Sequence, residues 1–264
     1  MITKEDKSFI TEVVKHYRKH GRHDLEWRKK LTPYRVLVSE VMLQQTQVSR
    51  VLPKFISWMK QYPSLRALSE SNLRDVLLLW QGLGYQRRAK ALLSLAKEYT
   101  KIPTTFSELL TLPGIGRYTA SALCAFAYDT FQHPVLETNI RTALIEYFHQ
   151  GEMSIHDGAL YDDLFRLEKS RAVQKLGART WYYALMDFGA HLKTSSISHN
   201  RKSAHHAIQP PYKGSLRELR AKTLFAITRK KVLPKDKRLA IVLGQLEKEN
   251  YITKNKSTYM LNDF

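Results

Sequence analysis

The sequence predicts an all-α protein with a small α+β module at its C-terminal end. Segments with apolar residues at helical spacing follow one another to about residue 200, and none of them alternates as a β-strand does. The connections between these segments have the usual length of helix–helix turns. A Pro-rich linker at 209–214 then precedes two more helical segments and two short strand-like segments. We therefore expect a helical domain over 1–209 and a separate module over 210–264.

The periodic segments are separated by recognisable start and break signals. Pro33 stands at the first turn of the second segment, and Thr138 or Asn139 is a plausible N-cap of a later one. A polar Gln44-Gln45-Thr46 triplet interrupts an apolar helical stretch, which is typical of a loop in a polar groove or of a solvated corner. The expected helices of the main domain cover 7–17, 33–60 with that interruption, 65–68, 73–80, 89–99, 120–128, 143–148 and 181–192.

The charge of the chain indicates a polyanionic partner. Its 43 Lys and Arg residues against 24 Asp and Glu give a formal charge of +19. Self-repulsion of this size disfavours a compact state, so nucleic acid is the expected partner, ahead of an anionic membrane surface. No apolar run approaches the roughly 20 residues of a membrane span, and the polar start is unlike a signal peptide. The single Cys124 leaves no intrachain disulfide, so we expect a reducing cytoplasm or nucleoid.

A glycine-containing turn at Leu112–Ala120 joins two apolar helical segments. Gly114 and Gly116 lack a Cβ atom and can adopt positive φ, while Gly116-Arg117 opens the second helix with its N–H groups unpaired. Backbone amides at such a turn are suited to hold a phosphate without regard to base identity. The alternative is a helix–helix corner without a ligand.

The module at 210–264 has the pattern of a winged helix-turn-helix. Helical spacing covers 215–228 and 236–249, and two short strands follow within 251–261. By count, 13 Lys and Arg residues stand against 5 Asp and Glu in this module. In a winged helix the second helix enters the major groove and the hairpin lies on the backbone. The alternative is an interaction domain with a basic, solvated face.

Two glutamates are candidates for acid–base chemistry. Glu40 lies in an apolar helical segment, where burial would raise its pKa and suit it to act as a general acid. Glu137 precedes Asn139 at a helix start, where the N–H groups would hold its carboxylate ionised. A protonated carboxyl that faces an ionised one can break a glycosidic bond. For Glu40 the alternatives are a position on the polar face of the helix or a structural ion pair. For Glu137 the alternative is a simple capping role.

Five stretches together resemble one protein family. They are Trp27-Arg28, Thr32-Pro33-Tyr34, Ser39 to Val48, Trp80 to Tyr85 and Leu112 to Thr119. In order and spacing they resemble the adenine DNA glycosylase branch of the helix-hairpin-helix (HhH-GPD) DNA glycosylase superfamily, over residues 7–192. The resemblance implies a two-lobed helix-hairpin-helix fold. A six-helix barrel would cover about 33–130, and a second lobe would join 1–30 to 131–209.

The resemblance also implies a role for each matching position. Glu40 would protonate a flipped adenine, Glu137 would lie beside the sugar, and Asn139 would position Glu40 or water. Tyr118 stands where bifunctional relatives have a Schiff-base lysine, which implies hydrolysis to an abasic site without strand cleavage. Gln45 would fill the gap in the base stack and Tyr85 would intercalate beside the opposite base. The remaining positions implied to contact DNA or line the base pocket are Leu25, Trp27, Arg28, Thr46, Val48, Leu112, Gly114, Gly116 and Arg117.

Three departures from the family pattern limit what the resemblance implies. The family has Asp-Gly-Asn where this chain has Glu137-Thr138-Asn139, so the carboxylate reaches one methylene further. The four cysteines of an iron–sulfur cluster are missing from about Lys193 onward, so no cluster and no other metal is expected. The histidines around this position are too irregularly spaced for zinc, namely His191, His199, His205 and His206. The winged-helix-like module replaces the family's Nudix-type C-terminal domain.

Three hypotheses of function follow from these observations. The favoured one is a monofunctional glycosylase that acts on double-stranded DNA and excises adenine opposite 8-oxoguanine or guanine, and we expect it to be a monomer. A thymine or uracil mismatch glycosylase is compatible with Tyr118 but disfavoured by Gln44-Gln45. A non-catalytic protein that reads duplex shape is supported only by Glu137 in place of aspartate. No membrane association is expected for any of them.

Overall fold

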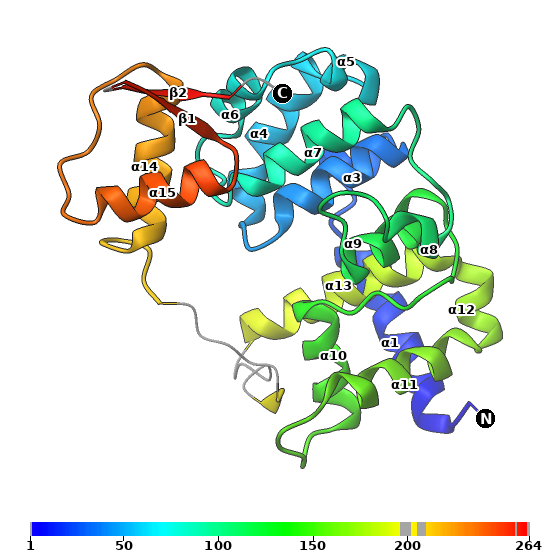
Figure 1. The fold of residues 1–264 in the computed structure, drawn as a ribbon. Coiled ribbons are helices and arrows are strands. Elements are labelled where there is room, and N and C mark those ends of the chain that lie inside the picture. The colour runs from blue at the N-terminus through cyan, green and yellow to red at the C-terminus, as the bar shows by residue number, and fades with distance from the viewer. Residues whose placement is uncertain (1, 196–201, 205–209, 257, 263–264) are drawn as a thin grey trace. The chain divides into compact units, whose positions relative to one another are not determined.

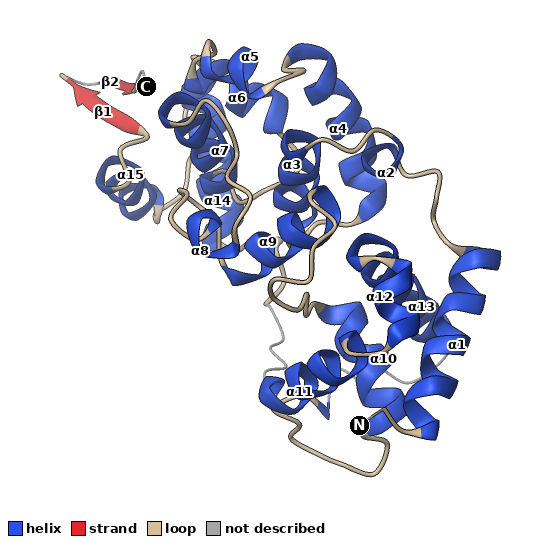
Figure 2. Ribbon diagram, turned by 90° about the vertical axis from the view of Figure 1, so that its right-hand side faces the viewer, coloured by secondary structure: helices blue, strands red, loops and turns tan. Residues whose placement is uncertain are grey.

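The computed structural model describes residues 2–195, 202–204, 210–256 and 258–262. Two compact units share the chain: Met1–Leu37 with Pro103–Ile208, and Val38–Ile102 with Gln209–Phe264. Helices make up most of the described part, and one two-stranded antiparallel sheet completes it (Figures 1 and 2). The predicted fold class is therefore confirmed. None of the described helices has the length and hydropathy of a membrane span.

In its described residues, the unit that contains the N-terminus is built from helices and the turns between them, with one isolated parallel β-bridge between Ile155 and Ser203. Its helices are α1 (Lys4–His20), α2 (Glu26–Lys29), the start of α3 (Pro33–Leu43), α8 (Phe106–Leu109), α9 (Arg117–Ala122), the π-helix η1 (Leu123–Ala127), α10 (Thr138–Phe148), α11 (Asp157–Glu168), α12 (Arg171–Leu176) and α13 (Ala178–Ser195). Phe9 of α1 is fully buried at the centre of an aromatic cluster. Its ring centroid lies 4.7 Å from that of Tyr147, 5.0 Å from Phe148 and 6.2 Å from Phe188. This burial ties α1 to α10 and α13.

Helices α10 and α13 approach each other closely at Gly189. A Cβ atom at this position would lie only 1.9 Å from the carbonyl oxygen of Asn139. Glycine is therefore required here by the space that the backbone of α10 occupies, because any side chain would push the two helices apart. This contact fixes the first turn of α10 against the middle of α13.

A buried carboxyl–phenol pair lies in the same unit. The Tyr182 hydroxyl donates a hydrogen bond to the Glu168 carboxyl group, and both side chains are almost inaccessible to solvent. Burial raises the pKa of Glu168 to about 7, although the bond from Tyr182 opposes this shift. Glu168 is therefore partly protonated near neutral pH.

We expect Glu168→Gln to change how stability depends on pH. The raised pKa means that the folded state favours protonated Glu168. Its contribution to the free energy of unfolding is therefore complete below about pH 4.5 and is lost as pH rises through about 7. Glutamine keeps an oxygen that accepts from Tyr182 and carries no charge. The variant should therefore gain stability relative to wild type between pH 5 and 8, by up to about 3 kcal/mol, in urea unfolding. Exposed Glu12, replaced by glutamine, is the control, and a parallel pH dependence of wild type and Glu168→Gln would contradict the expectation.

The second unit places its helices around two buried tryptophans. The helices are α4 (Val48–Gln61), α5 (Leu65–Ser69), α6 (Leu73–Trp80), α7 (Arg87–Glu98), α14 (Leu216–Thr228) and α15 (Leu239–Lys248), together with the end of α3. Trp58 and Trp80 pack edge to face with ring centroids 5.5 Å apart, and both are nearly inaccessible. Asn72 caps α6 by accepting a hydrogen bond from the Asp75 amide at 2.9 Å.

The segment after residue 210 has the predicted order of two helices and a hairpin. Ser215 caps α14, and the strands β1 (Ile252–Asn255) and β2 (Thr258–Leu261) pair antiparallel with Ile252 opposite Leu261. Figure 1 shows this segment in orange and red, with α14 against α6. The Lys90 ammonium of α7 donates to the carbonyl oxygens of Glu249 at 2.6 Å and Asn250 at 3.2 Å. The segment is thus anchored on the helices of its own unit.

Candidate active site

The glycine turn forms the expected hairpin between α8 and α9. Gly114 has φ +77°, in the left-handed region that favours glycine. The expectation of a positive φ at Gly116 is wrong, because this residue has φ −94° and serves as the extended N-cap of α9. A Cβ at Gly116 would meet no atom within 4 Å, so glycine here leaves the N-terminus of α9 uncovered. The arrangement matches the predicted phosphate contact, which stays a prediction.

His133 braces this hairpin from the segment that follows η1. Its ring stacks on Phe106 with centroids 4.4 Å apart and planes 5° apart. Its Nδ1 atom lies 2.9 Å from the Ser121 hydroxyl, and its Nε2 atom lies 2.9 Å from the Arg117 guanidinium. Burial lowers the pKa of His133, and the charge of Arg117 acts in the same direction. Neutral His133 therefore accepts from exposed Arg117 and holds it at the turn.

Glu40 lies inside the apolar part of α3. Its side chain is 4% exposed, and the adjacent Ser39 is 1% exposed. The alternative of a solvated position on the polar face is therefore excluded. The same helix ends at Leu43, directly before the Gln44-Gln45-Thr46 turn, so a buried carboxyl group precedes this turn by one helical turn.

Two non-glycine residues near this turn have left-handed backbones. Gln45 has φ +54° and Tyr85 has φ +44°, and glycines at 82 and 84 also have positive φ. Non-glycine residues in this region are strained and are enriched at functional sites. Both residues that the resemblance assigns to the base stack thus have left-handed backbones.

Arg88 joins the two turns through its buried guanidinium group. One nitrogen donates to the carbonyl oxygens of Val41 and Gln44, both at 2.6 Å. The other donates to the carbonyl oxygens of Leu83 at 3.0 Å and Gly84 at 3.2 Å. The Thr46 hydroxyl adds a direct bond to the Leu83 carbonyl at 3.2 Å. The end of α3 and the 81–85 turn are therefore fixed relative to each other by one cation.

The partners of Arg88 are carbonyl dipoles and aromatic faces. Its guanidinium carbon lies 5.4 Å from the ring centroids of Trp80 and Tyr85. Burial lowers the pKa of Arg88 to about 10, which still leaves it charged at neutral pH. The role of Arg88 could not be predicted from the sequence, because an arginine one position after another arginine at a helix start carries no signal of its own.

Replacing Arg88 with methionine should destabilise the protein by about 3 kcal/mol or more. The variant leaves several buried carbonyl oxygens without a donor, and each unsatisfied group costs roughly 1–3 kcal/mol. Urea unfolding measures the loss. The control is Arg87→Met, which removes the exposed neighbouring arginine. Equal, small losses in the two variants would show that the Arg88 bonds contribute little.

Glu137 caps α10 and is bonded to the helix that it begins. Its Oε1 atom accepts from the backbone N–H groups of Asn139 at 2.8 Å and Ile140 at 3.0 Å. The expected N-cap at Thr138 or Asn139 is therefore wrong by one or two residues, because the longer side chain of Glu137 reaches both amides. Lys193 of α13 donates to the Asn139 side-chain oxygen at 2.7 Å. Together, Glu137, Asn139 and Lys193 form a charged cluster at the start of α10.

Burial raises the pKa of Glu137 above its ordinary value. The bonds from Asn139 and Ile140 and the charges of Lys193 and Arg22 act in the opposite direction but do not overcome this effect. The backbone N–H groups at the helix N-terminus lower this pKa as expected, but burial raises it by more. The charges of Lys193 and Arg22 add to these N–H groups in favouring the ionised form.

Arg28 is engaged in a buried bidentate pair. Its two terminal nitrogens donate to Asp187 at 2.7 and 3.0 Å, and Arg22 donates to the same carboxylate at 2.7 Å. Burial works against ionisation of Asp187, but the bonds and charges of the two arginines hold its pKa below the usual range. The Arg28 guanidinium also lies 4.0 Å over the Tyr183 ring. This pairing gives Arg28 a structural role, and a DNA contact by it stays a prediction.

The predicted site residues are divided between the two compact units. The first unit holds Leu25, Trp27, Arg28, Leu112, Gly114, Gly116, Arg117, Tyr118, Glu137 and Asn139, and the second holds Glu40, Gln45, Thr46, Val48 and Tyr85. Within the first, Glu137 and Asn139 are in direct contact, with the Asn139 side-chain amide 3.3 Å from the carboxylate. Within the second, Arg88 brings together the Gln45 and Tyr85 turns. Trp27 is buried, and Tyr118 is half-buried.

The donor set of these 264 residues does not fit an iron–sulfur cluster. Cys124 is the single cysteine and lies fully buried in η1. Burial raises the pKa of its thiol to about 11, so it stays protonated at neutral pH. Lys193, where the family's first cysteine would fall, bonds to Asn139 instead. His199, His205 and His206 lie outside the described residues, and the expected lack of a cofactor stays a prediction.

The fold is that of helix-hairpin-helix DNA glycosylases. A solved thermostable thymine-DNA glycosylase aligns with a TM-score of 0.59 at 21% identity, covering 71% of this chain and 87% of that one. A structure of endonuclease III trapped as a covalent intermediate with DNA aligns with a TM-score of 0.57 at 17% identity, covering 83% and 95%. The family model described as "HhH-GPD superfamily base excision DNA repair protein" matches residues 38–210. The chain belongs to this superfamily.

Curated relatives share higher identity over a shorter region. An adenine DNA glycosylase of Buchnera aphidicola subsp. Schizaphis graminum is 41% identical over 145 residues, which cover 53% of this chain and 42% of the relative. An adenine DNA glycosylase of Mycolicibacterium smegmatis is 43% identical over 136 residues, which cover 49% and 46%. The chain thus spans less than half the length of these relatives.

Proposed function

We propose that this protein is a monofunctional adenine DNA glycosylase that acts on adenine opposite 8-oxoguanine or guanine. The identity of more than 40% to named adenine DNA glycosylases carries this proposal. Buried Glu40 and Glu137, the N-cap of α10, supply the two carboxyl groups that the reaction needs. A monomer that acts on double-stranded DNA in the cytoplasm, associated with the nucleoid, belongs to the same proposal.

In this mechanism Glu40 donates a proton to the adenine ring. Burial favours the neutral carboxyl group, and protonation makes the base a better leaving group. Glu137 in its ionised form stabilises the positive charge that develops on the sugar as the glycosidic bond breaks. Lys193 and Arg22 favour this ionised form against the effect of burial. Water then adds to the sugar carbon that the base has left and gives up a proton, which restores protonated Glu40, and the product is an abasic site.

The remaining predicted residues serve extrusion of the base. Gln45 fills the gap in the stack and Tyr85 intercalates beside the opposite base, and Arg88 holds both turns in place. Tyr118 stands at the position of the Schiff-base lysine and cannot form an imine, so strand cleavage is not expected. Gly114, Gly116 and Arg117 grip a phosphate at the hairpin.

A single-turnover assay with defined duplexes tests this function. Each duplex pairs 8-oxoguanine or guanine with adenine, thymine or uracil, and alkali then converts abasic sites to strand breaks. We expect breaks at adenine after alkali and none before it. Breaks only at thymine or uracil would show that the protein excises one of these bases and not adenine. Tight binding without any break would refute an enzymatic function.

We expect Lys193→Met to move the acidic limb of the pH–rate profile to higher pH. The lysine charge lowers the pKa of Glu137, so its removal raises this pKa. Glu137 then becomes protonated at a higher pH, and excision is lost earlier as the pH falls. A shift of roughly one pH unit is expected for one charge at a buried carboxylate. Single-turnover excision between pH 4.5 and 8.5 measures the limb. Lys193→Arg keeps the charge and is the control, and identical profiles for the two variants would contradict the expectation.

A further inference from the structure

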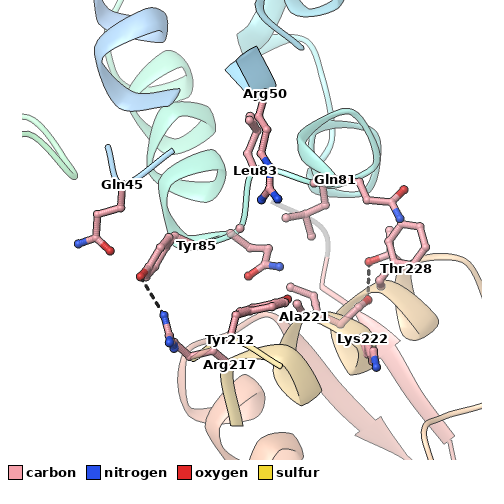
Figure 3. A pocket seen from close by; sticks show the side chains of 16 residues that line it. Gln45, Arg50, Gln81, Leu83, Tyr85, Tyr212, Arg217, Ala221, Lys222 and Thr228 are labelled. Carbon is pink, nitrogen blue, oxygen red and sulfur yellow. Dashed lines mark hydrogen bonds between the residues drawn. The ribbon is translucent and has the colours of Figure 1, made fainter. Parts of the chain in front are cut away.

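A cavity of about 470 Å³ lies within the second unit, between the 81–86 turn and α14. Its volume is in the range of small-molecule and nucleotide sites. Figure 3 shows Tyr85 and Arg50 on the wall formed by the helical core, and Tyr212 and Arg217 on the wall formed by the C-terminal segment. Both walls belong to the same compact unit. None of the residues with proposed acid–base roles lines this cavity.

The lining of the cavity combines cations with aromatic rings. Among its 16 lining residues are Arg50, Arg217 and Lys222, and no aspartate or glutamate. The aromatic side chains are Tyr85, Tyr212 and Phe225, which offer faces for a planar group. Cations beside exposed aromatic faces are the combination with which proteins hold the phosphate and base of single-stranded nucleic acid.

Two of these side chains are available to a ligand. Tyr212 is 52% exposed although it lines the cavity. Arg50 is exposed on α4, and its side chain makes no hydrogen bond or ion pair with another residue of the described ranges. Lys222 is less available, since its ammonium pairs with Glu218 at 2.9 Å. An aromatic face and an unpaired cation thus face a cavity without negative charge.

The C-terminal segment is tied to the turn that bears Tyr85. Arg217 donates to the Tyr85 hydroxyl at 3.3 Å and to the Pro210 carbonyl oxygen at 2.6 Å. The Tyr85 backbone is strained at φ +44°. The Arg88 guanidinium donates to the carbonyl oxygens of Leu83 and Gly84, the two residues before Tyr85. The cavity is therefore held by bonds from both walls, as a preorganised binding site requires.

We propose that this cavity binds one unpaired nucleotide of a DNA strand. The base would stack on Tyr212, and its phosphate would contact Arg50 and Arg217. The C-terminal segment thereby contributes a nucleotide subsite to the DNA-binding surface. The inference rests on the proposed action on DNA, but it does not depend on which base is excised.

Equilibrium binding of the full chain to two duplexes tests the inference. Both lack any mismatch and any 8-oxoguanine, and one carries a single unpaired 2-aminopurine nucleotide in one strand. Wild type should bind the duplex with the unpaired nucleotide at least about fivefold more tightly, because stacking on an aromatic side chain stabilises a bound base by this much or more. The 2-aminopurine fluorescence should fall on binding as the base stacks.

Two pairs of variants assign the effect to the cavity. Tyr212→Ala should abolish most of the preference and the fluorescence change, whereas Tyr259→Ala, outside the cavity, should keep both. Arg50→Ala should weaken binding of the duplex with the unpaired nucleotide more than that of the paired one. Lys60→Ala removes an exposed charge from the same helix and should affect both duplexes equally.

Three outcomes would overturn the inference: equal binding of the two duplexes by wild type, a preference that survives Tyr212→Ala, or losses in the variants that are equal for both duplexes. The last two would place the unpaired nucleotide elsewhere on the protein. Because neither duplex carries adenine opposite 8-oxoguanine or guanine, failure here is separate from failure of adenine excision, which the single-turnover assay reports.

Discussion

Replacing Glu40 with glutamine should lower the single-turnover rate of adenine excision by about 10²- to 10⁴-fold. General acid catalysis contributes this much in other enzymes, and the glutamine amide cannot donate the proton that the leaving base requires. Glutamine has nearly the same shape and carries no charge, so it fits the site where Glu40 is 4% exposed. Affinity for a duplex with adenine opposite 8-oxoguanine should stay within about twofold of wild type.

The matched control for Glu40 is Glu98, an exposed glutamate at the end of α7 in the same unit. Glu98→Gln removes one carboxylate from the same part of the chain and should leave excision unchanged. Excision by Glu40→Gln at the wild-type rate would remove Glu40 from the catalytic step. Loss of both excision and DNA affinity would instead make it a structural residue.

The burial of Glu40 could be predicted because it follows from local periodicity. The residues around it on α3 are apolar at helical spacing, so the interior was the favoured place for this carboxyl group. The two long helices and the hairpin after residue 210 were predictable for the same reason, since capping residues and spacing are local. Ser215 and the turn at Gly114 are examples in which one residue type fixes the local conformation.

The bonds that hold the site could not be predicted from spacing. Arg88 bonds to carbonyl groups more than 40 positions earlier in the chain, and Lys193 bonds to Asn139 across 54 positions. Carbonyl acceptors leave no trace in a sequence, because every residue has one. The requirement for glycine at 189 is equally hidden, since it arises from the backbone of a different helix.

The ionisation of Glu137 shows how tertiary structure can reverse a local rule. Two backbone N–H groups and a helix N-terminus stabilise a carboxylate, which is the expectation from sequence. Burial opposes them and leaves the pKa raised, while cations from α13 and from the α1–α2 connection limit the rise. Lys193 and Arg22, which are remote in sequence, thus add to the local N–H groups that favour the anion of the mechanism.

Replacing Glu137 with glutamine should therefore lower excision by about 10²- to 10³-fold. Loss of one preorganised electrostatic group at a developing charge has an effect of this size. Glutamine keeps an oxygen that can accept from the Asn139 and Ile140 amides, so α10 keeps its cap. Unfolding free energy should change little, and single-turnover excision on the duplex with adenine opposite 8-oxoguanine measures the loss.

Glu137→Asp separates charge from reach at the same position. Aspartate keeps the negative charge but shortens the side chain by one methylene, and a displacement of about 1 Å at a reacting centre can cost 10²-fold. If the charge is what acts on the sugar, Glu137→Asp should retain more activity than Glu137→Gln. Adding Lys193→Met to Glu137→Asp should still move the acidic limb of the pH–rate profile. Equal activity of wild type and Glu137→Gln would show that this residue only caps α10, because the cap is the one property that both share.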